Sequence, residues 1–204
     1  LNGFGCSVVR FDNRGHGRSG GRRGYVEDYN VYIEDADRIV TVAKEENSGL
    51  PIFMLGHSMG GFITAFYGIK YPERIAGQIL SGAAVILSPM VKDLEGLDYN
   101  AVALDPIPNA LAEVVCRNPD VVKAYVEDPL VLKEFTMKLM GEVLITGARQ
   151  LMEAMPEYRY PCLILHGGGD LIVPPDASKY FYEHISSQDK ELKIYEGLYH
   201  EILN

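Results

Sequence analysis

The chain is poor in cysteine, in clustered basic residues and in long apolar runs. Its three cysteines, Cys6, Cys116 and Cys162, are odd in number and far apart along 204 residues. This spacing favours free thiols in a reducing setting, so we expect a cytoplasmic protein. No cysteine and histidine spacing resembles a metal site, and neither a metal nor a cofactor is expected. No run approaches the ~18 apolar residues of a membrane span.

The charge balance excludes a further class of partner. The formal net charge is −9, and the only adjacent basic pair that stands out, Arg22 and Arg23, is too short to form a basic tract. Nucleic acid is therefore not an expected partner. Hydrophobic residues make up 47% of the chain, and its length is that of one domain with a substantial core.

The most informative motif lies at residues 56–61, which read GHSMGG. A short apolar run at 51–55 precedes it and has the character of a buried strand. Apolar residues at helical spacing follow it: Phe62, Ile63, Phe66 and Tyr67. The motif therefore predicts a sharp strand-to-helix turn with Ser58 exposed at its tip.

Such a turn suits nucleophilic attack by Ser58. We expect Gly56 and Gly60 to leave room for the turn to close against its neighbours. The backbone N–H of Met59, at the helix start, can help to hold the oxyanion that forms when Ser58 attacks a carbonyl. The alternative is a serine in an ordinary glycine-rich turn, but the strand and helix patterns around it favour the nucleophile.

A serine nucleophile needs a base, and turns of this kind place it after the acid in the chain. His16 lies upstream of Ser58, and His57 is adjacent to it, so its side chain should point away from the attacking oxygen. His166 ends a strand pattern, and His184 belongs to a helix pattern. His200 follows the last strand pattern through a short turn, which makes it the predicted base.

Asp170 is the predicted acid. It follows the apolar run at 161–165, and catalytic groups in open α/β sheets gather at the carboxyl ends of strands. The alternative role is a turn cap before the double proline at 174–175. Asp176 is the rival acid, but its position after the prolines is typical of a helix start.

Strand and helix patterns alternate along the chain, which indicates an α/β fold with a mostly parallel sheet flanked by helices. The expected strands are 6–11, 51–55, 75–81, 161–165 and 192–195, with a helix over 26–47. Residues 87–155 show helical stretches broken by prolines and no good strand pattern. We therefore divide one domain into a first core part (1–86), an inserted helical cap (87–155) and a second core part (156–204).

The predicted cap is rich in apolar residues, among them Met90, Leu111, Phe135, Leu139 and Met155. For each one, packing of the cap against the core is the simpler explanation. Together they suit a substrate with a long acyl chain and allow transient contact with a lipid surface.

Three further segments carry a resemblance to a known family. Residues 12–21, 117–130 and 187–201 resemble segments of the α/β-hydrolases of the monoacylglycerol lipase and lysophospholipase group. The resemblance extends over most of the chain. It implies the α/β-hydrolase fold and a serine ester hydrolase that acts on a small lipid ester through an acyl-enzyme.

The same resemblance assigns roles to particular residues. It implies that Ser58, Asp170 and His200 are nucleophile, acid and base, and that the Met59 amide is one oxyanion donor. Arg14 and His16 would brace a loop near the site. The alternatives are a short-chain carboxylesterase or thioesterase and, from another class, a non-catalytic hydrolase-fold binding protein. The oligomeric state and the head group stay open.

In the resembled family, three strands precede the one expected at 6–11. The third lies between this strand and the one at 51–55, and its loop supplies the second oxyanion amide. We therefore expect these 204 residues to be part of a longer protein. We expect residues 6–11 and 51–55 either to leave a gap or to pair directly, and the isolated chain to aggregate.

Overall fold

The computed structural model describes residues 1–88, 91, 94 and 96–204. Met90, which the sequence analysis assigns to the cap, lies outside the described residues.

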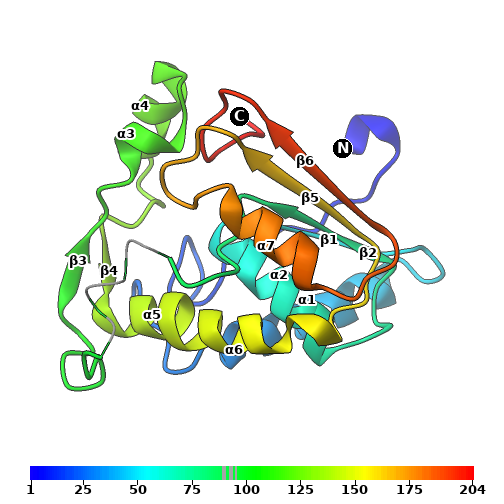
Figure 1. Cartoon of the computed structure of the whole chain (residues 1–204), viewed down its shortest axis with the longest axis horizontal. Coiled ribbons are helices and arrows are strands. Elements are labelled where there is room, and N and C mark those ends of the chain that lie inside the picture. Colours follow the sequence, from blue (N-terminus) through cyan, green and yellow to red (C-terminus); the bar gives the residue numbers. More distant parts are fainter. Residues whose placement is uncertain (89–90, 92–93, 95) are drawn as a thin grey trace.

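The centre of the fold is a four-stranded parallel sheet (Figure 1). Its strands are β1 (Phe53–His57), β2 (Gly77–Ser81), β5 (Cys162–Gly167) and β6 (Lys190–Tyr195), in the spatial order β1-β2-β5-β6. Neighbouring strands pair in parallel register, for example Leu55 with Ile79 and Ile79 with Leu163. The strands expected near 51–55, 75–81, 161–165 and 192–195 are confirmed, with ends shifted by a few residues.

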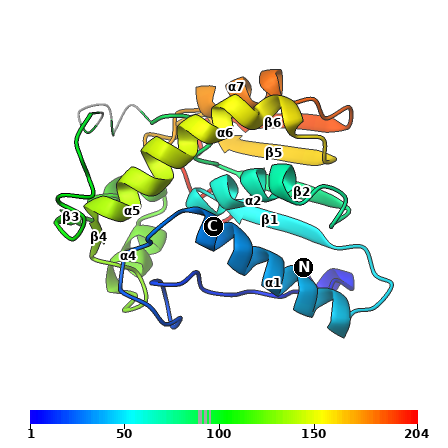
Figure 2. The ribbon, with the colours of Figure 1, turned by 90° about the horizontal axis from the view of Figure 1, so that it is seen from below.

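Four helices cover one side of this sheet, as Figures 1 and 2 show. They are α1 (Asn30–Glu46), α2 (Met59–Lys70), α6 (Ala148–Ala154) and α7 (Asp176–His184). Helix α1 forms where a helix was expected over 26–47, because its buried side chains recur at helical spacing. These side chains are Tyr32, Ile33, Ala36, Val40 and Ala43.

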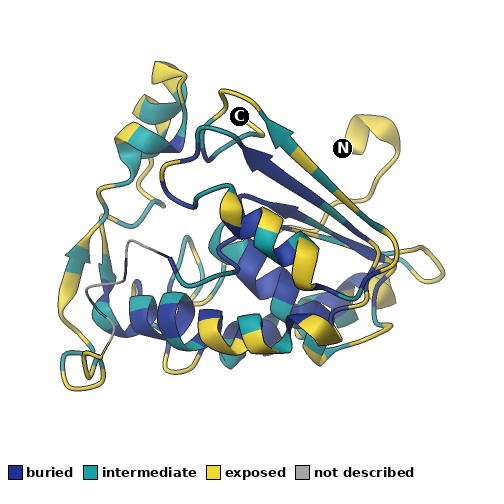
Figure 3. Cartoon of the chain, in the orientation of Figure 1, coloured by how far each residue is buried: buried dark blue, intermediate teal, exposed yellow. Residues whose placement is uncertain are grey.

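The hydrophobic core lies between the sheet and these helices (Figure 3). Phe62 of α2, Leu80 of β2, Ile164 of β5 and Phe181 of α7 are all almost completely buried there. Leu80 and Ile164 are register partners, so one face of the sheet contributes a continuous apolar row to the core.

The strand expected at 6–11 is wrong. Residues 6–11 have no regular structure and are exposed, and only a short 3₁₀ turn, η1 (Asn2–Phe4), precedes them. Within the described chain, β1 is an edge strand that pairs with β2 alone. A strand exists only where a neighbouring strand accepts its hydrogen bonds, and a local apolar pattern cannot supply that neighbour.

The segment 87–155 is not purely helical, so the expectation of no strands there is also wrong. Strands β3 (Pro106–Pro108) and β4 (Glu134–Thr136) form a small antiparallel pair. Strands of three residues are too short to show an alternating pattern. The remaining elements are α3 (Ala112–Val115), α4 (Pro119–Glu127), α5 (Met137–Gly141), the π-helical turn η3 (Glu142–Gly147), α6 and the 3₁₀ turn η4 (Met155–Glu157).

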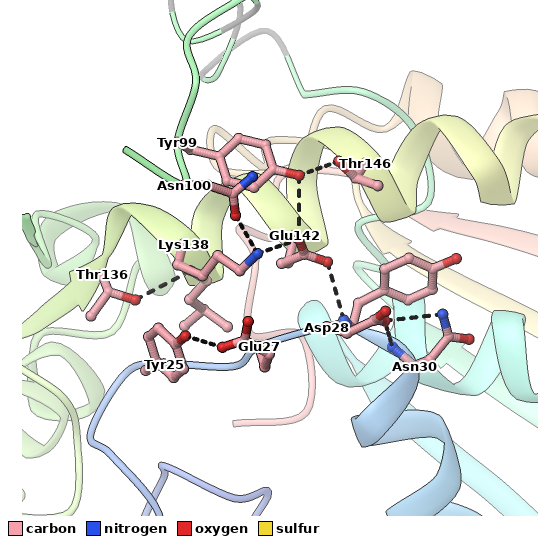
Figure 4. Close-up of polar contacts among 12 residues, drawn as sticks. Tyr25, Glu27, Asp28, Asn30, Tyr99, Asn100, Thr136, Lys138, Glu142 and Thr146 are labelled. Carbon is pink, nitrogen blue, oxygen red and sulfur yellow. Dashed lines mark hydrogen bonds and ion pairs between the residues drawn. The ribbon is translucent and has the colours of Figure 1, made fainter. Parts of the chain in front are cut away.

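A buried polar network joins α5 and η3 to the loop at residues 99–100 (Figure 4). The Lys138 ammonium lies 3.0 Å from Glu142 Oε1 and donates to Asn100 Oδ1 at 2.6 Å. Tyr99 donates its hydroxyl to Glu142 Oε1 at 3.3 Å, and the Tyr29 amide donates to Glu142 Oε2 at 3.3 Å. The network holds this helix against both the loop at 99–100 and the N-terminal part of the chain.

Candidate active site

Ser58 occupies the turn between β1 and α2 in a conformation that residues other than glycine seldom adopt, with φ 55° and ψ −119°. The backbone around it fixes this geometry. Its N–H donates to Ser81 O at 3.0 Å, and its carbonyl accepts from Phe62 N at 3.1 Å and Ala84 N at 3.2 Å. The expected sharp strand-to-helix turn is therefore present.

The glycines of the turn differ in their roles. A Cβ at Gly56 would lie 2.1 Å from Gly60 O, so only glycine fits there. A Cβ at Gly60 would meet no atom within 4 Å, whereas one at Gly61 would lie 2.4 Å from Ala83 Cβ. The expectation that Gly60 leaves the necessary room is therefore corrected: Gly56 and Gly61 allow the close packing.

Met59 is the first residue of α2, directly after Ser58. The first N–H groups of a helix have no partners within the helix, and the helix dipole places partial positive charge there. Met59 also lines the same cavity as Ser58. Its amide thus belongs to the helix end that meets the cavity.

Asp170 follows β5 and is buried. Both of its carboxylate oxygens accept hydrogen bonds from N–H groups. Oδ1 accepts from the amides of Ile172 at 2.8 Å and Val173 at 3.0 Å. Oδ2 lies 2.6 Å from His200 Nδ1 and 3.2 Å from His166 Nε2. Burial alone would raise the pKa of Asp170, but the hydrogen bonds from His166 and His200 lower it well below its usual value.

His200 is 4% exposed and meets Asp170 through Nδ1. A carboxylate can only accept, so Nδ1 carries the proton and, in the neutral ring, Nε2 is a free base. Gly82, at φ +51°, leaves room for the ring, because a Cβ there would lie 3.1 Å from His200 Nδ1. The structure thus brings Asp170 and His200 together as the sequence analysis expects.

His57 links these residues to the turn. Its ring centroid is 4.5 Å from that of His200, and its Nδ1 lies 3.2 Å from Ser81 Oγ. Burial, together with the nearby charge of His200, lowers the pKa of His57 to about 4. His57 is therefore neutral at physiological pH and adds no charge beside His200.

His166 has a function that the sequence analysis did not assign. Its Nε2–H is shared between Val173 O, at 2.8 Å, and Asp170 Oδ2, at 3.2 Å. Its Nδ1 accepts from Ser178 Oγ of α7 at 2.6 Å. His166 thus contacts the same carboxylate oxygen, Asp170 Oδ2, as the N–H of His200. Its place four residues before Asp170 was the only signal in the sequence.

A cavity of about 260 Å³ opens beside Ser58. Only His16, Ser58 and Ser88 contribute polar side chains to its lining among the described residues. The apolar lining comprises Met59, Ala84, Ile86, Leu111, Phe135, Leu139, Met140, Val143, Leu144, Ile172, Val173 and Pro174. Six of these, from Leu111 to Leu144, lie in the segment 87–155, which thus forms one wall over Ser58.

The remaining residues considered from the sequence lie elsewhere or act in support. Asp176 is exposed and pairs with Lys179 at 3.0 Å, so it does not reach His200. His184 is exposed and stacks on Tyr180. Arg14 binds Asp35 through Nε at 2.8 Å, and His16 Nδ1 donates to the Arg14 carbonyl at 3.1 Å. Arg14 therefore braces the loop that brings His16 to the cavity.

The described residues contain no cluster of His, Cys, Asp or Glu suited to a metal ion. Among the same residues, no helix is long and apolar enough to span a membrane.

The parallel sheet, the strained serine turn after β1 and the buried aspartate after β5 are typical of an α/β-hydrolase fold, and the expected fold class is confirmed. The chain belongs to the Hydrolase_4 family, described as serine aminopeptidase, S33, whose family model matches residues 1–204.

Three individual relatives are monoacylglycerol or monoglyceride lipases. A monoacylglycerol lipase of Mycolicibacterium smegmatis is 35% identical over 98% of this chain and 73% of its own length. The human monoglyceride lipase is 34% identical over 98% of this chain and 68% of its own length. The crystal structure of a Paleococcus ferrophilus monoacylglycerol lipase superposes with a TM-score of 0.81 at 32% identity, over 93% of this chain and 73% of that one. The resemblance stated from the sequence is confirmed.

Proposed function

We propose that this protein is a serine ester hydrolase that cleaves monoacylglycerols, with Ser58 as nucleophile, His200 as base and Asp170 as acid. The observation that carries the proposal is the strained turn that presents Ser58 to an apolar cavity. The similarity to a monoacylglycerol lipase and a monoglyceride lipase supports the same substrate class.

In the first half of the reaction, Ser58 Oγ attacks the ester carbonyl and its proton passes to His200 Nε2. The negative charge on the carbonyl oxygen is held by the Met59 amide at the start of α2. Asp170 keeps the His200 proton on Nδ1 and stabilises the charged ring. The ester C–O bond then breaks, and His200 returns its proton to the leaving glycerol oxygen.

In the second half, water attacks the acyl-enzyme. His200 Nε2 takes a proton from the water, and the tetrahedral intermediate collapses. The bond to Ser58 Oγ breaks, the serine regains its proton from His200, and a fatty acid is released.

The family description, serine aminopeptidase, raises a peptide amino terminus as an alternative ligand. The cavity lining favours an acyl chain instead. An aminopeptidase must hold a charged amine, and this needs a carboxylate or several acceptors near the nucleophile. No Asp or Glu is among the described residues that line the cavity. An apolar chain, in contrast, gains free energy on burial there.

We propose that residues 87–155 act as the cap of this site and make transient contact with lipid surfaces. Several apolar side chains of the segment are exposed, including Leu104 at 49% and Val126 at 53%. We further propose a cytoplasmic location, because Cys6, Cys116 and Cys162 are all free thiols. Vesicle flotation and cell fractionation of the full-length protein test these two points.

The central experiment measures hydrolysis of monoacylglycerols from acetyl to lauroyl by the full-length protein, together with labelling by a fluorophosphonate. We expect kcat/KM to rise with acyl length until the cavity is full, by up to about fourfold per methylene. Ser58→Ala should remove labelling and lower kcat by about 10⁶-fold.

Ser48→Ala is the matched control, because Ser48 is an exposed loop serine and its loss should change neither quantity. A flat or falling dependence on acyl length indicates a short-chain esterase or thioesterase. A protein that is neither labelled nor active on any ester is a binding protein.

A further inference from the structure

A second cavity borders β4 and lies next to the first. It has a volume of about 410 Å³ and is lined by residues of the N-terminal loop and of the β3–β4 region. The lining residues are Arg22, Arg23, Leu104, Pro106, Leu132, Lys133, Glu134, Phe135 and Thr136. Phe135 also lines the cavity beside Ser58, so one residue borders both spaces.

The N-terminal loop is fixed against β4 at this point. The Gly24 carbonyl accepts from the Thr136 amide at 3.0 Å and from the Thr136 hydroxyl at 2.7 Å. Gly24 has φ +61°, and a Cβ there would lie 3.0 Å from Glu134 O. Glycine therefore permits the close approach that holds Arg22 and Arg23 beside the β4 strand.

Three residues with cationic side chains, Arg22, Arg23 and Lys133, line this cavity in a chain whose net charge is −9. The Arg23 guanidinium donates to the carbonyls of Ser19 at 2.8 Å and Gly17 at 3.0 Å. The Lys133 ammonium donates to the carbonyl of Val126 at 2.7 Å.

Neutral carbonyls orient these groups without cancelling their charge. Among the described residues, none of the three side chains of Arg22, Arg23 and Lys133 forms an ion pair. Among the described residues that line the cavity, Glu134 is the one carboxylate, against the three cations Arg22, Arg23 and Lys133, so this lining carries an excess of positive charge.

The apolar residues of the lining are Leu104, Pro106, Leu132 and Phe135. Cations beside an apolar wall match a molecule with a carboxylate at the end of a hydrocarbon chain. We propose that this second cavity binds a long-chain carboxylate, the fatty acid that ester cleavage releases at the neighbouring cavity. This inference rests on the proposed function.

The positive charge of the second cavity also distinguishes the product from the substrate. A monoacylglycerol is neutral, whereas a fatty acid is ionised at neutral pH. Arg22, Arg23 and Lys133 therefore attract the product and not the substrate, and they do so from a site that shares Phe135 with the acyl cavity. The second cavity gives the released acid a place to bind outside the reaction site.

The test measures laurate binding by calorimetry to full-length protein whose acyl cavity has been filled by a long-chain alkyl fluorophosphonate on Ser58. We expect about one laurate to bind, and dodecanol to bind about tenfold more weakly because it lacks the charge. Arg22→Gln combined with Lys133→Gln should weaken laurate binding about tenfold and leave dodecanol binding unchanged. Lys44→Gln, an exposed cation of α1, is the matched control and should bind laurate like the parent.

The proposal is overturned if laurate and dodecanol bind equally, or if the double variant binds laurate like the parent. It is also overturned if the double variant loses only its partition onto phosphatidylglycerol vesicles, which would identify a membrane-contact surface. Intact labelling and ester hydrolysis with no laurate binding would reject this inference and leave the proposed function in place. If Ser58 is not labelled, the proposed function fails, and the parent and double variant are compared without the reagent.

Discussion

Ser58 combines a reactive hydroxyl with backbone strain. A residue with a Cβ at φ 55° and ψ −119° costs about 1–3 kcal/mol, and the hydrogen bonds to Ser81, Phe62 and Ala84 hold it there. We predict that Ser58→Gly relieves this strain and raises the free energy of unfolding by about 1 kcal/mol, after the larger chain entropy of glycine is subtracted. Urea unfolding of both proteins measures the difference.

Ser58→Ala is the control, because it keeps the Cβ and therefore the strain. It should unfold at nearly the same urea concentration as the parent, and both variants should be inactive. A glycine variant that is less stable than the alanine variant would contradict the strain argument.

His57 should make stability depend on pH. In the unfolded protein the pKa of His57 is about 6.5, and in the folded protein burial is the main cause that lowers it to about 4. Between these values the unfolded state binds more protons, so stability is complete above pH ~6.5 and declines as pH falls toward 4. The His57 contribution lost across this range is about 3 kcal/mol.

We therefore predict that His57→Gln flattens the decline of the free energy of unfolding between pH ~6.5 and ~4. Unfolding by urea at a series of pH values measures the slope. His184→Gln is the matched control, because His184 is exposed, and its slope should follow the parent. Equal slopes for the parent and His57→Gln would show that His57 is charged in the folded protein.

Among the helices, α5 and η3 depend on a buried ion pair (Figure 4). Lys138 and Glu142 have side chains only 8% and 10% exposed, and Glu142 also accepts from Tyr99 and Tyr29. We predict that Glu142→Leu lowers the free energy of unfolding by about 3–5 kcal/mol, because Lys138 then lacks its partner. Thermal or urea unfolding measures the loss.

The double variant Lys138→Met with Glu142→Leu should be more stable than Glu142→Leu alone, since no buried charge is left unpaired. The pair Lys123 and Glu127 has the same spacing on α4 but is 69% and 65% exposed. Glu127→Leu should therefore change stability by less than about 0.5 kcal/mol. A double variant less stable than Glu142→Leu would show that Lys138 stabilises the fold by itself.

The elements differ in how far sequence alone could predict them. The runs at 51–55 and 161–165 became strands because β2 lies beside both and supplies their hydrogen bonds. Residues 6–11 have a similar apolar character and remain irregular, since strand formation depends on a neighbour that no local pattern reveals. The three-residue strands β3 and β4 were missed for lack of length.

The candidate site also has parts that the sequence predicts and parts that only the folded structure reveals. The order of Ser58, Asp170 and His200 along the chain follows from the turn chemistry and was predictable. The second histidine contact of Asp170 comes from His166, whose ring is oriented by Ser178 of α7 and by the Val173 carbonyl. Such a contact between an element end and the next helix requires the packed structure. Likewise, only the folded chain shows that Arg22, Arg23 and Lys133 line one cavity.

At the scale of the whole molecule, the helices of the described chain that pack on the sheet cover one of its two faces. In the described chain, α1, α2, α6 and α7 all lie on the same side (Figure 2). On the other side, Leu55, Ile79 and Leu163 form a row across β1, β2 and β5. Parallel sheets are normally covered on both faces, and an apolar face beside an open edge strand promotes association.

We predict that the isolated 204-residue chain self-associates through this face and the β1 edge. Phe53 and Leu55 on β1 are 62% and 47% exposed. Replacing both with lysine should shift the chain toward monomer, because charge there opposes pairing of exposed apolar edges. Val42→Lys is the control, since Val42 of α1 is 45% exposed but lies on the helical side, and it should associate like the parent. Sedimentation velocity at increasing concentration measures the outcome, and a parent chain that stays monomeric throughout would show that this face does not drive association.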